Sequence, residues 1–439
     1  MEYLRFDRLL MTNLEKSLDK EILRTNRAGA YSSGTIVDCN TRKYHGLLVV
    51  PVEKLGGNHV LLSSCDETLI QHGAEFNIGL HKYAGDYYSP RGHKYIREFR
   101  LGAVSTTIYR IGGVILQKER IIVEGENRIM VAYTLLEAHS ATTLRLRPFL
   151  AFRSVNKLTE KNDKARTDYR EGDNGVAFCM YEGYPELVMQ TNKQMQWVSE
   201  PNWYDGVEYS KEAERGYAFK EDLFVPGYFE LSIKKGETVI FTAGTSEMSS
   251  RRMKRLFDDE KAKHIVREDF LSCLKVSAEQ FYNRCSDGTY LLAGYPWFGY
   301  RARDQFIALP GATLYAGHTK MFDEIMTRGE VALREFMNAE RATTRLAEVD
   351  APDVLLWAVW AIQQYALKMG IDVYALPETL SALKVEEHHR AHSVEPLKTY
   401  TINTFEIMPV EMHHDCPCVG YMLYSKKTGE RLFFATDTY

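Results

Sequence analysis

The feature that most constrains this chain is a long run of short segments, from about residue 30 to residue 245, in which apolar and polar residues alternate. A period of two is typical of β-strands that bury one face. The segments Thr106–Arg110 and Val114–Lys118 flank Ile111-Gly112-Gly113, and this arrangement predicts a hairpin with a permissive turn. Many short strands with frequent turn signals predict an antiparallel β-sandwich.

Two more hairpins are predicted along the same stretch. Ile121–Val123 and Ile129–Leu135 lie on either side of a Glu-Gly-Glu-Asn turn, and Tyr228–Ile233 and Thr238–Ala243 on either side of Lys-Lys-Gly-Glu. Between them, residues 144–147 read Leu-Arg-Leu-Arg, a clean alternation. Such alternation predicts one face toward a core and one toward solvent.

The period becomes helical near residue 250. Arg267–Tyr282 places Phe270, Leu274, Ala278 and Phe281 on one stripe, as an amphipathic linker helix does. Further helices are expected at Phe306–Ala316, Phe322–Phe336 and Leu355–Tyr365. The last of these is apolar nearly all round, which predicts a buried helix. After about residue 367 short strands return, at Thr401–Val410, Val419–Tyr424 and Arg431–Ala435.

Composition excludes several classes of protein. The net charge of −4 over 439 residues offers no basic face for nucleic acid. No apolar run approaches the ~20 residues that span a bilayer, so no membrane partner is expected. The first residues contain no apolar signal region, and the seven cysteines are odd in number and mostly scattered. Both features favour a cytoplasmic protein without a disulfide framework.

The first motif lies near the N-terminus. Residues 25–35 read T-N-R-A-G-A-Y-S-S-G-T and residues 40–48 read N-T-R-K-Y-H-G-L-L. Taken alone, this is a strand pair with turns and satisfied polar groups. The pattern resembles the N-terminal domain of prokaryotic glycogen debranching enzymes, which is a β-supersandwich. The resemblance implies that Arg42, Tyr44 and His45 either lie near the sugar site or hold the interface with the catalytic barrel.

A second stretch resembles the same domain. Residues 203–209 read W-Y-D-G-V-E-Y, residues 214–216 read E-R-G, and residues 221–227 read E-D-L-F-V-P-G. The motifs occur in the order that the family has them. Together the two stretches extend the resemblance over most of the predicted sandwich.

A third motif, at residues 294–311, reads G-Y-P-W-F-G-Y-R-A-R-D-Q-F-I-A-L-P-G. A carboxylate, a guanidinium and an indole suit sugar recognition by hydrogen bonding and stacking, although a helix-capping Asp with a surface Arg is the plain alternative. The motif resembles the start of the amylo-α-1,6-glucosidase domain, an α/α toroid. That resemblance implies glucose binding by Trp297, Arg303 and Asp304, while Ala302 departs from the usual Gly.

A fourth motif follows at residues 349–352, V-D-A-P, and residues 356–363, L-W-A-V-W-A-I-Q. It resembles a helix of the same glucosidase domain and implies that Asp350 faces the sugar. The alternative is an N-cap for the helix that follows, with Pro352 in its first turn.

No catalytic residue is assigned. Glycoside hydrolysis ordinarily uses two carboxylates that flank the scissile bond. The family takes its general acid from a T-W-M-D motif and its base from a later Glu, and T-W-M-D does not occur in this sequence. We therefore treat Asp304 and Asp350 as binding residues, and expect the chain to bind glucan weakly at best and to hydrolyse nothing.

The last part of the chain is rich in histidine. Five histidines lie between residues 388 and 414, with Asp415, Cys416, Cys418 and Asp437 close by, a set that suits zinc but lacks zinc-finger spacing. This part resembles the second half of a metallo-β-lactamase-fold hydrolase, which implies His414 and Asp437 as metal ligands. The first ligand set of that fold, H-x-H-x-D-H, is absent, so we expect no stable zinc site.

The two resemblances meet at Gln363–Lys368, which suggests a junction of unrelated coding sequences. The expected fold is mainly β: a supersandwich at residues 1–248, linker helices at 249–285, a truncated start of an α/α toroid at 286–365, and a short α/β tail at 366–439. We expect the tail to pack poorly against the rest.

The leading functional hypothesis is a truncated, inactive relative of enzymes that act on α-1,6-linked glucose at glycogen branch points, without a cofactor. A non-catalytic α-glucan-binding module and a metal-dependent hydrolase acting through the tail are the alternatives.

Overall fold

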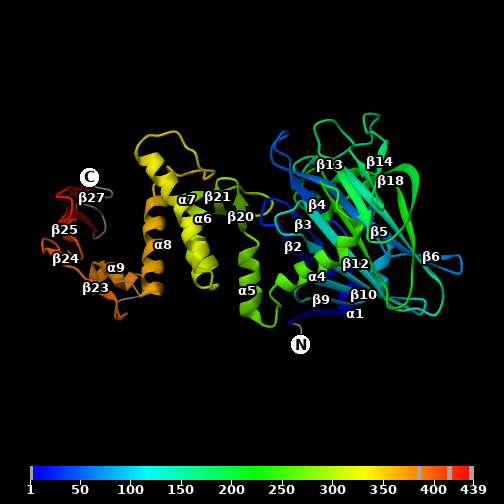
Figure 1. Cartoon of the computed structure of the whole chain (residues 1–439), viewed down its shortest axis with the longest axis horizontal. Helices are drawn as coiled ribbons and strands as arrows, with labels where there is room; N and C mark the ends of the chain where they lie inside the picture. Colours follow the sequence, from blue (N-terminus) through cyan, green and yellow to red (C-terminus); the bar gives the residue numbers. More distant parts are fainter. Residues whose placement is uncertain (1–2, 371, 383–386, 413–417, 435–439) are drawn as a thin grey trace. The chain divides into compact units, whose positions relative to one another are not determined.

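The computed structural model describes residues 3–370, 372–382, 387–412 and 418–434. The chain forms two compact units, residues 1–300 and residues 301–439 (Figure 1). The first unit is a two-sheet antiparallel sandwich and the second begins with helices, so the predicted mainly β fold class is confirmed. None of the helices in the described ranges is both long enough and apolar enough to cross a lipid bilayer.

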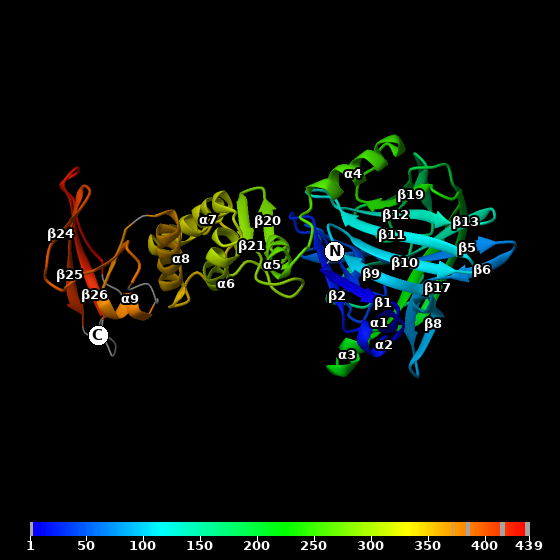
Figure 2. The ribbon, with the colours of Figure 1, turned by 90° about the horizontal axis from the view of Figure 1, so that it is seen from below.

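The first sheet of the sandwich has nine strands, and Figure 2 shows β9 to β12 side by side. In spatial order its strands are β1 (Leu4–Asp7), β9 (Ile96–Leu101), β10 (Ser105–Ile111), β11 (Val114–Ile122), β12 (Arg128–Glu137), β19 (Thr238–Gly244), β16 (Leu187–Thr191), β15 (Gly175–Phe178) and β14 (Tyr169–Gly172). Short helices α1 (Arg8–Thr12) and α2 (Leu14–Ser17) follow β1, and η1 (Gly92–Tyr95) precedes β9.

The second sheet has eight strands. In spatial order they are β17 (Gln196–Glu208), β18 (Lys220–Ile233), β13 (Thr142–Ser154), β5 (Asn58–Gln71), β4 (Gly46–Pro51), β3 (Tyr31–Thr35) and β2 (Glu21–Thr25), with β6 (Ala74–Asn77) also paired to β5. A separate hairpin joins β7 (Leu80–Tyr83) and β8 (Tyr87–Arg91).

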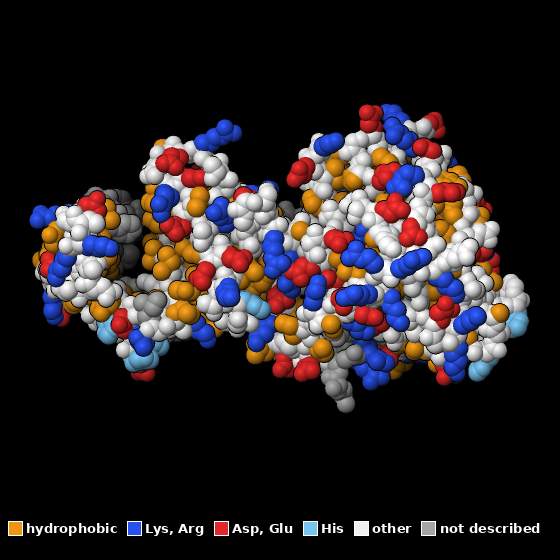
Figure 3. All heavy atoms as spheres, in the orientation of Figure 1, with side chains coloured by type: hydrophobic (Ala, Val, Ile, Leu, Met, Phe, Trp, Pro, Cys, Tyr) orange, Lys and Arg blue, Asp and Glu red, His pale blue; other side chains and the backbone are white. Residues whose placement is uncertain are grey.

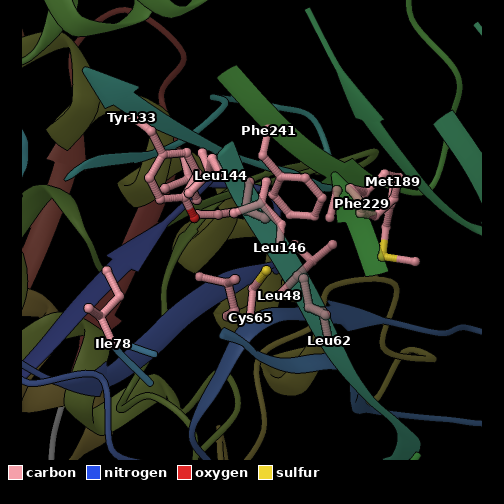
Figure 4. Packing of buried hydrophobic residues seen from close by; sticks show 14 of the residues in the cluster. Leu48, Leu62, Cys65, Ile78, Tyr133, Leu144, Leu146, Met189, Phe229 and Phe241 are labelled. Atoms are coloured by element: carbon pink, nitrogen blue, oxygen red, sulfur yellow. The ribbon is translucent and has the colours of Figure 1, made fainter. Parts of the chain in front are cut away.

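The hydrophobic core lies between the two sheets. Leu144 and Leu146 of β13 are fully buried, as the alternation in that strand predicted. They pack with Tyr133, Phe229 and Phe241 in one cluster (Figure 4). Burying each such side chain contributes about 1.5–3 kcal/mol, so the packing of these residues stabilises the sandwich.

Two of the three predicted hairpins are confirmed. β10 and β11 pair in register from Ile111↔Val114, and the turn between them takes positive φ at Gly112 (52°) and Gly113 (89°). Positive φ at both turn residues is the hairpin geometry that glycine permits without strain. β11 and β12 likewise pair on either side of the predicted second turn.

The third predicted hairpin is wrong. Both strands exist, but β18 belongs to the eight-stranded sheet and β19 to the nine-stranded one. The turn between them carries the chain from one sheet to the other, and the rings of Phe229 and Phe241 meet in a T-shaped arrangement with centroids 5.7 Å apart. Alternation predicts that a segment is a strand with a buried face. It does not tell which strand will be the partner.

Two helices follow the sandwich. After η2 (Ser250–Arg252), α4 (Met253–Lys263) packs Met253 and Phe257 on the outer face of the nine-stranded sheet. The predicted amphipathic helix is α5 (Phe270–Glu279), capped by Asp269. The first part of its apolar stripe is exposed, with Phe270 at 65% and Leu274 at 50%, whereas Ala278 and Phe281 are part-buried. A hairpin of β20 (Tyr282–Cys285) and β21 (Gly288–Leu291) comes next.

The second unit starts with the predicted helices. They are α6 (Ala302–Leu309), continued by the π-turn η3 (Pro310–Leu314), then α7 (Thr319–Met337) and α8 (Val354–Met369). Gly329 lets α7 approach α6, since a Cβ there would stand 2.6 Å from the ring of Phe306. The stacked rings of Phe322 and Tyr365, 4.8 Å apart, join α7 to α8.

Helix α8 corrects one prediction. It was expected to be buried all round, but Ala358 and Ala361 face inward while Leu356 and Ile362 are 56% and 49% exposed. Figure 3 shows hydrophobic side chains gathered on the surface over α8. The small residues permit close helix contact and the large ones point outward. The helix runs unbroken through Gln363–Lys368 and ends at Gly370, whose φ is 74°.

The tail combines strands with a short helix. β22 (Val373–Ala375) and β23 (Ala391–Ser393) pair in parallel, with α9 (Pro377–Ala382) between them in sequence. A four-stranded antiparallel sheet follows, made of β24 (Tyr400–Ile402), β25 (Phe405–Met412), β26 (Cys418–Ser425) and β27 (Arg431–Phe434). The predicted strand Thr401–Val410 is split in two by a turn at Asn403, whose φ is 52°.

Candidate functional site

A pocket of about 120 Å³ opens at one edge of the eight-stranded sheet. The strand β2, the strand β3, the turn at residues 41–45 and the segment 295–297 form its walls. The lining residues are Glu21, Ile22, Leu23, Tyr31, Ser33, Arg42, Tyr44, His45, Tyr295, Pro296 and Trp297. Four of the seven substrate-binding residues predicted from the sequence therefore meet here: Arg42, Tyr44, His45 and Trp297.

Glu21 organises the polar wall of this pocket. Arg42 Nε donates a hydrogen bond to Glu21 Oε1 over 2.8 Å, and His45 Nε2 lies 3.5 Å from Glu21 Oε2. On the other side of the imidazole, the backbone N–H of Thr41 donates to His45 Nδ1 over 3.2 Å. Because Nδ1 accepts, the ring proton of neutral His45 is on Nε2, toward the carboxylate.

This arrangement keeps Glu21 charged. Burial favours the neutral acid, but the hydrogen bond and positive charge of His45, followed by the hydrogen bond and charge of Arg42, outweigh it and lower the pKa of Glu21 to about 2. A carboxylate with so low a pKa is a poor general acid near neutral pH. In its ionised form Glu21 can accept hydrogen bonds from hydroxyl groups.

Aromatic rings form another part of the wall. Trp297 is 47% exposed, its ring lies 5.8 Å from that of Tyr44 in an edge-on arrangement, and the Arg42 guanidinium lies 5.9 Å from the indole centroid. Beneath them, the hydroxyl of Tyr31 donates to the backbone carbonyl of Tyr44 over 3.0 Å, and the rings of Tyr31 and Tyr295 are 5.5 Å apart. The buried tyrosines thus support the half-buried Tyr44, against which the exposed Trp297 packs.

The pocket is suited to binding and not to hydrolysis. It combines an exposed indole face, which can stack on an apolar sugar face, with a carboxylate and a guanidinium that can bind hydroxyl groups. Glu21 is the one carboxylate among its lining residues. Glycoside hydrolysis needs a pair of carboxyl groups on either side of the bond, and this pocket does not provide a pair.

The other predicted binding residues belong to the second unit. Arg303, in the first turn of α6, donates to Asp353 Oδ1 from Nε over 3.0 Å and from Nη2 over 2.7 Å. Trp357 Nε1 donates to Asp353 Oδ2 over 3.2 Å. Asp304 and Asp350 are both exposed. Arg303 is therefore paired with Asp353, and not with the neighbouring Asp304.

Asp353 and Glu21 were missed by sequence reasoning. Asp353 occupies the N-cap position of α8, so the alternative of Asp350 as the cap is wrong. Asp353 lies next to the quoted V-D-A-P motif, so an inspection of the residue after that motif could have found it. Glu21 precedes the first motif and carries no signal of its own, since its partners come to it through the fold of the turn at residues 41–45.

Residues of the second sequence motif serve the core. Glu221 and Arg153 form a buried ion pair, with Arg153 Nη2 donating to Glu221 Oε2 over 2.9 Å, and the Tyr209 hydroxyl also binds Glu221. The backbone N–H of Thr159 donates to Glu221 Oε1 over 3.0 Å. A buried carboxylate with this many partners holds the sheet and its loop together.

The predicted metal ligands His414 and Asp437 lie outside the described residues. Within the described ranges, no group of three or more His, Cys, Asp or Glu side chains is arranged to hold a metal ion. His392 in the tail pairs with Asp372 at 3.0 Å and stacks on Tyr374. These contacts give it a role within the parallel strand pair.

Comparison with protein families supports the sequence resemblance. Residues 20–240 match the family described as glycogen debranching enzyme N terminal, and residues 273–393 match amylo-α-1,6-glucosidase. The second match runs through Gln363–Lys368, where a junction was expected. The resemblance of residues 366–439 to a metallo-β-lactamase-fold hydrolase gains no support from these comparisons. No curated protein matches the chain significantly.

Among solved structures, the chain matches a bacterial glucoamylase complexed with acarbose, with 9% identity over 79% of this chain and 56% of that chain and a TM-score of 0.38. It also matches a polysaccharide lyase, with 13% identity over 54% of this chain and 34% of that chain and a TM-score of 0.23. The chain spans little more than half the length of the first and a third of the second. Since the first family match covers half of the 439 residues, the chain belongs to the family of glycogen debranching enzyme N-terminal domains, with a match to amylo-α-1,6-glucosidase after it.

Proposed function

We propose that this chain binds α-glucan, with glycogen as the natural ligand, through the pocket formed by Glu21, Arg42, Tyr44, His45 and Trp297. The observation that carries the proposal is the half-exposed indole of Trp297 in the same pocket as Glu21, a carboxylate whose pKa is lowered to about 2. A glucose unit stacks an apolar face on the indole while its hydroxyls donate to Glu21 and accept from Arg42. Membership in a glucan-processing family supports the choice of glucan as the sugar.

Arg303, Asp304 and Asp350 form a second, weaker contact in this proposal. All three are exposed, and Arg303 is already engaged by Asp353. Ionic contacts in high dielectric contribute little, typically about 0–1 kcal/mol. A sugar at this place competes with water and with Asp353, so its contribution to affinity is small.

The proposal separates binding from catalysis. Glycoside hydrolysis ordinarily needs two carboxyl groups that flank the bond, and the lining of this pocket contains one, Glu21, so the pocket in this proposal binds glucan without cleaving it. The binding module is therefore the function that we favour for this chain as given. It calls for no cofactor. A cytoplasmic location is part of the proposal, and cell fractionation tests it.

The experiment is affinity gel electrophoresis of the purified chain in gels with and without glycogen, together with an assay of glucose released from a limit dextrin. We expect retardation by glycogen and no glucose release. Trp297→Ala should abolish the retardation, while Tyr87→Ala, which removes a similarly exposed ring outside the pocket, should leave it unchanged. Migration unaffected by glycogen would refute binding, and released glucose would refute the separation of binding from catalysis.

A further inference from the structure

Two buried arginines in the first unit have no carboxylate partner among the described residues. Arg24 of β2 is 9% exposed, and Arg267, in the segment between α4 and α5, is 4% exposed. Arg267 Nη1 donates to the backbone carbonyl of Gly102 over 2.9 Å. Arg24 Nη2 is buried and has no hydrogen-bond partner within the described ranges. Two positive charges are therefore enclosed with little to balance them.

The fold brings these two arginines into the same region. β2 is fastened to the end of α5 through Thr25, whose backbone N–H and hydroxyl donate to the side-chain oxygen and the carbonyl of Gln280, each over 2.9 Å. Arg267 lies shortly before α5, and β2 also lies against β11, which carries Arg120. Burial and then the charges of Arg267 and Arg120 lower the pKa of Arg24 to about 9. This repulsion means that the guanidinium groups lie near one another.

The acidic side chains near this region are engaged by other cations. Glu279 of α5 pairs with Arg27 at 2.5 Å, and Glu124 pairs with Arg284 at 2.5 Å. His264, which follows α4, is part-buried, and burial together with the charges of nearby arginines lowers its pKa to about 4. Its ring is therefore neutral at pH 7 and offers one N–H donor. The region holds donors and positive charge, while its acids are already paired.

A buried charge without a partner is costly, and Arg24 is still protonated at neutral pH. Guanidinium groups bind oxyanions strongly, because two N–H groups can donate to two oxygens at once. We propose that Arg24 and Arg267 together bind a small tetrahedral oxyanion such as inorganic phosphate, with the ring N–H of His264 as a further donor. The burial of both arginines favours a small ion over a phosphorylated sugar. The inference does not depend on glucan binding, although Glu21 and Leu23 of the same strand line the pocket.

Thermal unfolding of the full chain in sodium phosphate, compared with sodium gluconate at equal ionic strength, tests this site. Wild type should unfold about 2–4 °C higher in phosphate, since an ion that binds only the folded state stabilises it. Arg24→Met should lose that rise. In gluconate this variant should unfold at a temperature no lower than wild type, because it replaces an unpaired buried charge by an apolar side chain. Arg110→Met, at an exposed position of β10, should keep the rise.

Equilibrium dialysis with labelled phosphate measures binding to wild type without any variant, and a single bound ion per chain is expected. No bound phosphate at millimolar concentration would overturn the proposal. An equal rise for wild type and Arg24→Met would also overturn it, because phosphate would then act as a general stabilising salt. A rise in sodium chloride as large as that in phosphate would contradict an oxyanion site. A large loss of stability for Arg24→Met in gluconate would mean that Arg24 already has a partner within the protein, and the proposal would fail.

Discussion

Charged and apolar residues are more restrained and more buried in the sandwich unit than in the helical unit. In the sandwich, Glu21 is tied by Arg42 and His45, and its pKa falls to about 2. In the helical unit, Arg303 and Asp353 pair at 2.7 Å with both side chains more than a third exposed. A charged pair becomes part of a built pocket only where the fold restrains both partners and limits access of water.

The apolar residues show the same contrast. Phe241 of the sandwich is fully buried, whereas Leu356 of α8 is 56% exposed although it stands in an almost uniformly apolar segment. The difference shows that hydropathy in the sequence does not fix burial. Burial depends on whether another element of the fold packs on the same face.

The largest expected difference between the two units is the loss of stability when an apolar side chain is truncated. Phe241→Ala should lower the free energy of unfolding by about 3–5 kcal/mol, since it removes contacts and leaves a cavity. Leu356→Ala should change it by less than about 0.5 kcal/mol, as exposed substitutions do. Denaturant unfolding followed by circular dichroism measures both. An equal cost for the two variants would show that the face of α8 is covered.

The next effect concerns ion pairs. Glu221→Gln leaves the buried Arg153 without its anion and should cost about 3 kcal/mol. Asp353→Asn removes the exposed partner of Arg303 and should cost about 0–1 kcal/mol. Thermal unfolding of the two variants beside wild type gives the comparison. A loss for Asp353→Asn as large as that for Glu221→Gln would mean that the helical unit also relies on its charged pair.

A smaller effect is expected with pH. The pKa of folded Glu21 is about 2, below its ordinary value of 4.5. The carboxylate therefore stabilises the fold above about pH 4.5, and this contribution is lost as the pH falls toward 2. The difference in stability between wild type and Glu21→Gln should shrink over that range, as measured by denaturant unfolding at a series of pH values.

Substitution of Arg42, which pairs with Glu21, gives a more direct test of the lowered pKa of Glu21. Arg42→Met should raise the titration midpoint of Glu21, which NMR of the side-chain carboxyl follows directly. A midpoint in wild type near 4.5 would contradict the pocket geometry, because it would mean that the hydrogen bonds from Arg42 and His45 do not form.

Much of the fold follows from sequence periodicity. Glycine pairs such as Gly112-Gly113 mark true hairpin turns, and the alternation in residues 144–147 assigns their inner face correctly. The Lys234–Glu237 turn does not reveal that it crosses between sheets, because alternation carries no information about strand partners. Similarly, the apolar pattern of α8 hides which of its faces will be packed.

Some members of the candidate pocket could be predicted, and others could not, for a related reason. Arg42, Tyr44, His45 and Trp297 belong to recognisable motifs, and the fold brings them together from positions 250 residues apart. Glu21 meets these residues only through tertiary contacts, so no local sequence pattern predicts that it lines the pocket. Arg303 pairs with Asp353 and not with its sequence neighbour Asp304, because α6 and α8 pack side by side. The sequences of the two helices do not show this packing.

The most direct test of the central claim, that glucan binds at the sandwich pocket, compares Trp297→Ala with Arg303→Ala for glycogen affinity in the full chain. The account predicts a loss of about tenfold or more for Trp297→Ala, as for a truncated stacking anchor, and less than about threefold for Arg303→Ala. A large loss for Arg303→Ala with an unchanged affinity for Trp297→Ala would contradict it and place the site in the helical unit.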